Sequence, residues 1–228
     1  MHCIKTHFCL TNFRNFLVGV FFKFIMATAI ESREGEVFNM FLALEVKCNQ
    51  EHRDFIGEIE DLQVRTTQMF PEQEPKPARV QSLHVTLATL MVNKEEEPFV
   101  IEAVGNAVDH FKRIHSDVDG IRADFQGGFT NRDVVCLHMG LGANTFNIFK
   151  QTLMVHGLHR FVTDMCQSPH LTVVRKLDLT EAEKDAVTDM MKGVTTARIT
   201  LDTVSLRERK RAGEQLKPPV KLFGLWRE

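Results

Sequence analysis

Two short stretches of the chain place a histidine and a threonine two residues apart within apolar sequence. The first is QSLHVTLATLMV, which contains His84 and Thr86, and the second is QSPHLTVVRKL, which contains His170 and Thr172. Side chains alternate between the two faces of a β-strand. Each stretch is therefore predicted to present an imidazole beside a hydroxyl on one face, with apolar residues behind them.

Two such histidines facing a common cleft have the groups that phosphodiester cleavage needs. A neutral imidazole can remove a proton from the nucleophile, and a protonated one can give a proton to the leaving oxygen. The ordinary pKa of histidine, about 6.5, lets both forms coexist around neutral pH. Threonine hydroxyls would donate hydrogen bonds to the non-bridging phosphate oxygens. We predict His84 and His170 as catalytic residues and Thr86 and Thr172 as phosphate-binding residues.

The prediction depends on the motif being doubled. A single histidine on a strand is more often a hydrogen-bonded structural residue than a catalyst. Here the two histidines are 170 − 84 = 86 residues apart, which is enough chain for one half of a duplicated fold.

Segments of strand and helix type alternate from residue 38 onward. Strands are expected at 38–46, 83–92, 121–126, 133–140, 170–176, 197–207 and 220–225, and helices at 51–70, 98–115 and 144–165. A further short helix is expected after Thr180, which forms a capping box with Glu183. Each half of this order contains a helix, an H-x-T strand and another helix. It predicts an α+β fold with helices packed on one face of each sheet.

The composition argues against several other classes of protein. The chain has 228 residues, 43% of them hydrophobic and 25% charged, with a formal net charge of −2. There is no overall basic field, so no extended nucleic-acid surface is expected. The five cysteines include no C-x-x-C pair, and none of the ten histidines has H-E-x-x-H spacing. We therefore expect free thiols, no metal, no cofactor, and a cytoplasmic or nuclear location.

The N-terminal residues 1–34 differ from the rest. No acidic residue precedes Glu31, and the apolar run FLVGVFF is followed by Lys23, so it is too short for a membrane-spanning helix. We expect a dispensable extension before a domain at 35–228. The alternatives are translation from Met26, membrane contact by residues 1–30, and mitochondrial or secretory targeting.

Several other residues are candidates for the site. Phe125 and Phe129 bracket a glycine turn and could stack on a nucleobase, with core packing as the alternative. Arg175 and Lys176 could bring positive charge to a phosphate or lie at a solvated strand end. We interpret His138 as structural or adjacent to the cleft.

The basic residues near the C-terminus are expected in a solvated hairpin loop. RNA contact and nuclear import are the alternatives. The residues are Arg207, Arg209, Lys210 and Arg211.

The tetrapeptides HVTL and HLTV resemble the paired signatures of the 2H phosphoesterase (LigT-like) superfamily. Together with FLALEV, the helix after Asn144 and SPHLTVVRKL, they resemble the phosphoesterase domain of the A-kinase anchoring protein 7 type, over about 38–225. The resemblance implies a pseudo-symmetric, two-lobed α+β fold, in which two antiparallel-rich sheets face a central cleft with helices outside. It also implies cleavage of 2′,3′-cyclic phosphates, 2′-5′ linkages or related RNA ends, and binding of AMP- or CMP-like monophosphates.

We therefore expect a metal-independent phosphodiesterase acting on a nucleotide or RNA end, with His170 as the base and His84 as the acid. One alternative is a sensor that binds nucleoside monophosphates with little or no catalysis, and another is an interaction protein. We expect a monomer. Because the sequence ends at Glu228, directly after the last predicted strand, no kinase-anchoring helix is expected.

Overall fold

The structure is a computed structural model, and it describes residues 37–116, 119–130, 134–175, 177–209 and 218–225. The strands are β1 (Val37–Glu45), β2 (Lys76–Pro77), β3 (His84–Asn93), β4 (Ile121–Ala123), β5 (Phe125–Thr130), β6 (Val134–Met139), β7 (Val162–Met165), β8 (His170–Arg175), β9 (Ile199–Leu201), β10 (Thr203–Glu208) and β11 (Lys221–Gly224). The helices are α2 (Arg53–Met69), α3 (Glu97–Ile114), α4 (Ala143–Val155) and α5 (Glu181–Met191). Short 3-10 turns are η1 (Gln50–His52), η2 (Pro71–Gln73), η3 (Val80–Ser82) and η4 (Leu158–Arg160).

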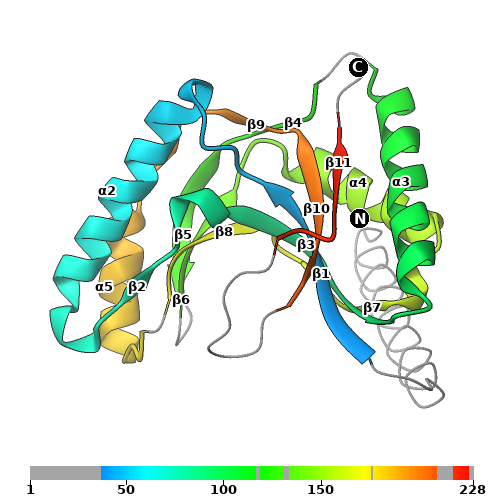
Figure 1. The fold of residues 1–228 in the computed structure, drawn as a ribbon. Coiled ribbons are helices and arrows are strands. Elements are labelled where there is room, and N and C mark those ends of the chain that lie inside the picture. Colours follow the sequence, from blue (N-terminus) through cyan, green and yellow to red (C-terminus); the bar gives the residue numbers. More distant parts are fainter. Residues whose placement is uncertain (1–36, 117–118, 131–133, 176, 210–217, 226–228) are drawn as a thin grey trace, which may run out of the picture.

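Antiparallel pairing joins most of the strands into one sheet, with helices at both of its ends (Figure 1). Its order is β11-β10-β1-β3-β8-β6-β5, with β2 paired to β8 and β7 paired to β3. The strands β4 and β9 form a separate two-stranded sheet. The predicted α+β class with antiparallel strands is confirmed.

The two motif strands, β3 and β8, are neighbours in this sheet rather than parts of two facing sheets. They pair antiparallel at Val85 and Leu171. Each strand pairs much more extensively with its outer neighbour, β3 with β1 and β8 with β6. The two halves of the fold therefore meet edge to edge, which satisfies backbone groups that two separate sheets would leave at their edges.

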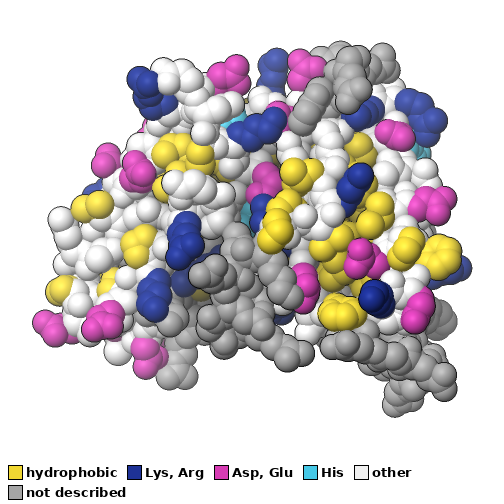
Figure 2. Space-filling model, viewed as in Figure 1, with side chains coloured by type: hydrophobic (Ala, Val, Ile, Leu, Met, Phe, Trp, Pro, Cys, Tyr) yellow, Lys and Arg dark blue, Asp and Glu magenta, His cyan; other side chains and the backbone are white. Residues whose placement is uncertain are grey.

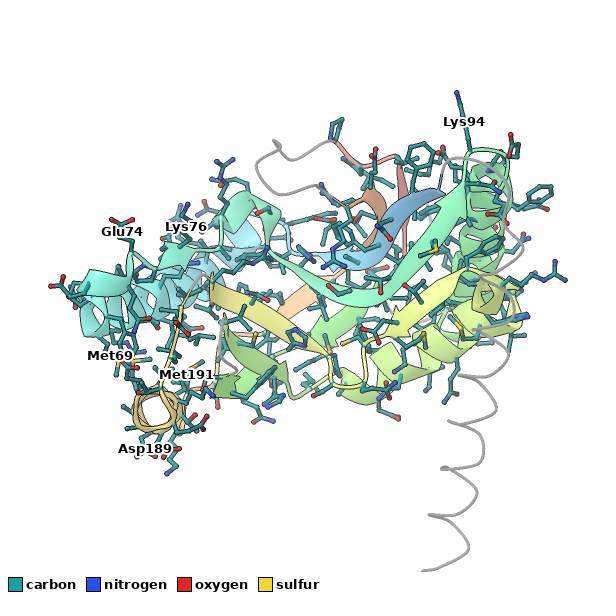
Figure 3. The ribbon with its side chains drawn as sticks, turned by 90° about the horizontal axis from the view of Figure 1, so that it is seen from below. Met69, Glu74, Lys76, Lys94, Asp189 and Met191 are labelled. Carbon is teal, nitrogen blue, oxygen red and sulfur yellow. The ribbon has the colours of Figure 1, made fainter. Side chains whose placement is uncertain are left out.

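The helices cover the sheet in two pairs. At one end α3 packs against α4, and at the other end α2 and α5 lie beside β8 and β5. In Figure 3, α5 is seen end-on next to α2, with Met69 and Met191 between the two helices and Lys94 at the far end of the molecule. The buried apolar side chains of the described residues form one continuous cluster, which includes Phe55 and Phe111.

Three predicted elements are wrong in part. The strand expected at 121–126 is divided between β4 and β5, and the strand expected at 197–207 is divided between β9 and β10. The expected helix at 144–165 ends at Val155, and Gly157 follows with a φ of 98°, in the left-handed region that glycine adopts without strain. The remaining residues form η4 and β7, where β7 pairs with β3. Tertiary pairing with a central strand has replaced the last turns of the helix.

The expectations for residues 1–34, and the domain boundary placed after them, lie outside the described residues. Within the described part of the chain, no helix is both long and apolar enough to cross a membrane.

The capping box of α5 provides a test of local stability. Thr180 accepts a hydrogen bond from the backbone N–H of Glu183, whose carboxylate accepts one from the backbone N–H of Thr180 at 2.7 Å. Thr180→Ala is expected to lower the free energy of unfolding by about 1 kcal/mol, measured by urea denaturation. Thr195→Ala, at an exposed position, is the control, and an equal loss in both variants would contradict a capping role.

Candidate functional site

The four residues of the two H-x-T motifs form a compact array at the centre of the sheet. Val85 pairs with Leu171 in antiparallel register. Continuing that register by one residue places His84 opposite Thr172 and Thr86 opposite His170, all on one face. The two imidazoles are then diagonal neighbours, on residues whose Cβ atoms are typically somewhat less than about 7–8 Å apart. That separation leaves room for a phosphate between the ring nitrogens.

A β-bulge follows each motif at the same place. On β3, Thr86 and Ala88 pair with consecutive residues of β1, which leaves Leu87 as the extra residue. On β8, Thr172 and Val174 pair with consecutive residues of β6, which leaves Val173 as the extra residue. Each bulge reverses the alternation of faces beyond it.

The second bulge determines where Arg175 points. In a regular strand Arg175 would lie on the face opposite Thr172, but the bulge returns it to the motif face. The corresponding residue of the first copy is Thr89, since 175 − 89 = 86, the same offset as between the histidines. Both side chains line a groove together with His84 and Thr86. Lys176, considered with Arg175, lies outside the described residues.

Both imidazoles are held in the same way. The Nδ1 atom of His84 lies 2.8 Å from the carbonyl oxygen of Ser82, and the Nδ1 atom of His170 lies 2.9 Å from that of Ser168. A carbonyl oxygen only accepts hydrogen bonds, so Nδ1 must carry the proton. In the neutral form, the Nε2 atom of each ring is then left to accept a proton from a substrate.

The surroundings of His84 are charged and partly buried. Glu45 is its cross-strand neighbour on β1, and the Glu45 carboxylate accepts hydrogen bonds from Arg207 Nε at 2.8 Å and from the Ser205 hydroxyl. The ring of Phe41 lies 5.4 Å from the His84 ring, between centroids. Burial is the largest influence and lowers the pKa of His84 below 6.5, with Glu45 opposing this shift and Arg207 adding to it.

The surroundings of His170 contain aromatic and imidazole groups instead. His138 is its cross-strand neighbour on β6, and the Ser168 hydroxyl lies 3.2 Å from His138 Nδ1. The Phe129 ring stacks on His138 at 4.5 Å and meets His170 edge-on at 5.4 Å. His138, interpreted from the sequence as structural or adjacent to the cleft, therefore lies on the motif face beside His170.

The two candidate stacking residues lie on opposite faces of β5. Phe125 is 0% exposed and packs against Phe55 in the core, so we withdraw it as a base-stacking residue. A third bulge, in which Gly127 has a φ of 57°, separates it from Phe129 and reverses the alternation between them. Phe129 reaches the motif face for that reason.

A groove of about 670 Å³ opens from the His84 side of the array. Its lining combines cationic, anionic and hydroxyl groups from several strands, and a guanidinium there offers the planar donors that phosphate oxygens accept. Within the described residues, Arg175 forms no ion pair. The lining residues are Phe41, His84, Thr86, Thr89, Thr163, Asp164, Arg175, Glu208 and Arg209.

The basic C-terminal residues are not one solvated loop. Arg207 lies within β10 and forms the ion pair with Glu45, and its side chain is only 13% exposed. Arg209 lines the groove, while Lys210 and Arg211 lie outside the described residues. On the face shown in Figure 2, lysine and arginine side chains are interspersed with acidic ones. Among the described residues, no group of three or more histidine, cysteine or acidic side chains is placed to hold a metal ion.

The sequence reasoning missed Ser82, Ser168 and Glu45. Both serines precede their histidine by two residues in the repeated pattern Q-S-x-H-x-T, so the longer repeat could have identified them. No local signal marks Glu45, because its contact with His84 depends on strand pairing.

The antiparallel α+β fold carries its two H-x-T motifs on neighbouring central strands. The profile of the 2′-5′ RNA ligase superfamily matches residues 50–213, which is more than half of the chain. The chain belongs to this superfamily, the LigT-like 2H phosphoesterases.

Solved structures support the same fold at low sequence identity. Escherichia coli LigT complexed with NADP+ is 18% identical, with a TM-score of 0.55, covering 84% of this chain and 100% of LigT. The complex of E. coli LigT with 3′-AMP is 16% identical, with a TM-score of 0.54, covering 84% of this chain and 100% of LigT. The PDE domain of MHV ns2 is 15% identical, with a TM-score of 0.51, covering 76% of this chain and 99% of that domain. No curated protein matches the sequence.

The protonation of the two histidines can be tested by NMR without any substrate. We expect both rings to show the Nδ1–H tautomer, and His84 to titrate below 6.5, the ordinary value. His84→Asn and His170→Asn assign the signals.

The lowered pKa of His84 also makes the free energy of unfolding depend on pH. Because burial disfavours the imidazolium, the unfolded chain takes up the His84 proton first as the pH falls below 6.5. His84 therefore contributes to a loss of stability on acidification, and His84→Asn should reduce that loss. An Nε2–H tautomer, or a His84 pKa above 6.5, would contradict the described contacts.

Proposed function

We propose that this protein is a metal-independent phosphodiesterase acting on 2′,3′-cyclic phosphates or 2′-5′ linkages of nucleotides and RNA ends. The observation that carries the proposal is the diagonal pair of imidazoles, each oriented by a backbone carbonyl and each flanked by a threonine. We assign these two activities to the domain expected at 35–228, because they are the activities that the resemblance to the superfamily implies.

Hydrolysis of a 2′,3′-cyclic phosphate would use both histidines in one step. One neutral Nε2 accepts a proton from water as the water oxygen forms a bond to phosphorus. The bond from phosphorus to one ribose oxygen breaks, and the other imidazole, protonated, gives that oxygen its proton. Thr86, Thr172 and Arg175 would donate hydrogen bonds to the non-bridging oxygens, where negative charge increases.

Cleavage of a 2′-5′ linkage fits the same groups. The free 3′ hydroxyl attacks the neighbouring phosphorus as it gives up its proton to the base. The bond to the 5′ oxygen breaks, and the acid protonates that oxygen. The products are a 2′,3′-cyclic phosphate and a 5′ hydroxyl, so no other reactant is needed.

The burial of His84 favours this residue as the base, which leaves His170 as the acid, the reverse of the sequence-based assignment. Burial lowers the pKa of His84, so its neutral form predominates at neutral pH. A base must be neutral before the reaction, whereas an acid must carry its proton.

Turnover should require both histidines. With EDTA present, His84→Ala and His170→Ala should each lower kcat on 2′,3′-cyclic nucleotides or 2′-5′ oligoadenylate by about 10²- to 10⁴-fold. His159→Ala, exposed on η4, is the matched control. Activity of both variants equal to the parent protein would refute the proposal. Tight monophosphate binding with no turnover by the parent protein would instead favour the sensor alternative.

A leaving-group comparison separates the acid from the base. A nucleoside p-nitrophenyl phosphodiester releases an anion that needs no proton. On this substrate His170→Ala should regain most of its lost rate relative to a poor leaving group, and His84→Ala should not. Selective recovery by His84→Ala would support the opposite assignment.

Arg175 should contribute to phosphate binding. A hydrogen bond to a charged group is worth about 1.5–3 kcal/mol, so Arg175→Gln should raise the Kd for a nucleoside monophosphate by roughly 10- to 100-fold, measured by calorimetry. Arg65→Gln, on the exposed side of α2, is the control. An unchanged Kd for Arg175→Gln would remove this residue from the phosphate site.

A further inference from the structure

The two histidines are chemically equivalent but have different neighbours across the strand. Glu45 lies opposite His84, and His138 lies opposite His170. Serine carbonyls hold both rings in the same way, so ring orientation does not distinguish them. A difference in their roles must therefore come from burial and from the surrounding charges.

Glu45 and Arg207 form a buried ion pair beside His84. Glu45 and Arg207 are joined by a contact of 2.8 Å, and each side chain is 13% exposed. The fully buried Ser205 donates a further hydrogen bond to the same carboxylate oxygen. A carboxylate this buried is stabilised only with its partner. Next to His84, the pair therefore presents a nearly cancelled charge.

We propose that Arg207 is a positioning residue that, through its buried pair with Glu45, offsets the carboxylate opposite His84 and so leaves that ring free to act as the base. This inference rests on the proposed phosphodiesterase function. Glu45 alone would draw a proton onto His84, because an opposite charge nearby favours the charged form. Arg207 offsets that attraction, and the buried setting of His84 then favours the neutral ring.

Other charged groups also face His84, and the Arg175 guanidinium influences its pKa more than Arg207 does. Arg175, from β8, also acts on His84 and lowers its pKa, while Glu45 raises it and Arg207 lowers it. The remaining charged residues that line the same groove are Asp164 on β7 and Glu208 and Arg209 on β10. Of all these groups, Glu45 is the cross-strand neighbour of His84.

Neutral variants of near-equal size test the inference. The readout is the acidic limb of the pH dependence of kcat/KM, which reports the protonation of the base in the free protein. In Arg207→Gln, Glu45 is no longer offset, so the limb should move to higher pH. In Glu45→Gln, the limb should move down. The double variant Glu45→Gln/Arg207→Gln, which restores charge balance, should return it close to the parent position.

A matched control uses another ion pair, which joins Lys47, two residues after Glu45, to Asp202 at 2.5 Å. Lys47→Gln/Asp202→Asn should leave the limb in place. If Arg207→Gln and Glu45→Gln lower kcat/KM without moving the limb, the pair is only structural and the inference is wrong.

An NMR titration of His84 in the same variants keeps this test separate from turnover. Shifts of the His84 pKa in opposite directions, with no phosphodiesterase activity in the parent protein, would refute the proposed function but retain the electrostatic coupling. Turnover that requires both histidines, with an unchanged His84 titration in both single variants, would refute the inference alone.

Discussion

The antiparallel register of β3 against β8 is the constraint on which the rest of the site depends. Pairing of Val85 with Leu171 fixes both strands, and the alternation of side chains then sets all four motif residues on one face. A slip of one residue would turn one histidine and its threonine into the core. The helices at either end of the sheet hold the two outer halves, and the apolar residues behind the motifs anchor the central strands.

Backbone geometry gives these side chains much of their chemical character. The serine carbonyls select the tautomer of each imidazole, and three β-bulges select which later residues return to the motif face. The Glu45 carboxylate next to His84 is largely buried and is paired with Arg207. Such a site is organised before substrate arrives, which reduces the reorganisation that catalysis would otherwise require.

Local periodicity was enough to predict most elements and the face shared by each histidine and its threonine. Local periodicity failed to predict the structure where a β-bulge or a helix end interrupted the regular spacing of residues. Phe125 and Phe129 would share a face in a regular strand, but the bulge at Gly127 separates them. The helix after Asn144 was extended past Gly157 for a similar reason, since the pairing of β7 with β3 is not encoded in helical spacing. Contacts between distant strands, such as that of Glu45 with Arg207, depend on register and leave no local pattern.

The difference between Thr89 and Arg175 has a consequence for how a substrate would lie. The two residues occupy equivalent places after the two bulges, but only one carries a charge. A perfectly twofold site would accept a phosphodiester running in either direction. With a guanidinium at only one of these two equivalent places, the two directions would differ in energy, and the array would have a polarity that distinguishes the 5′ side of a nucleotide chain from its 3′ side.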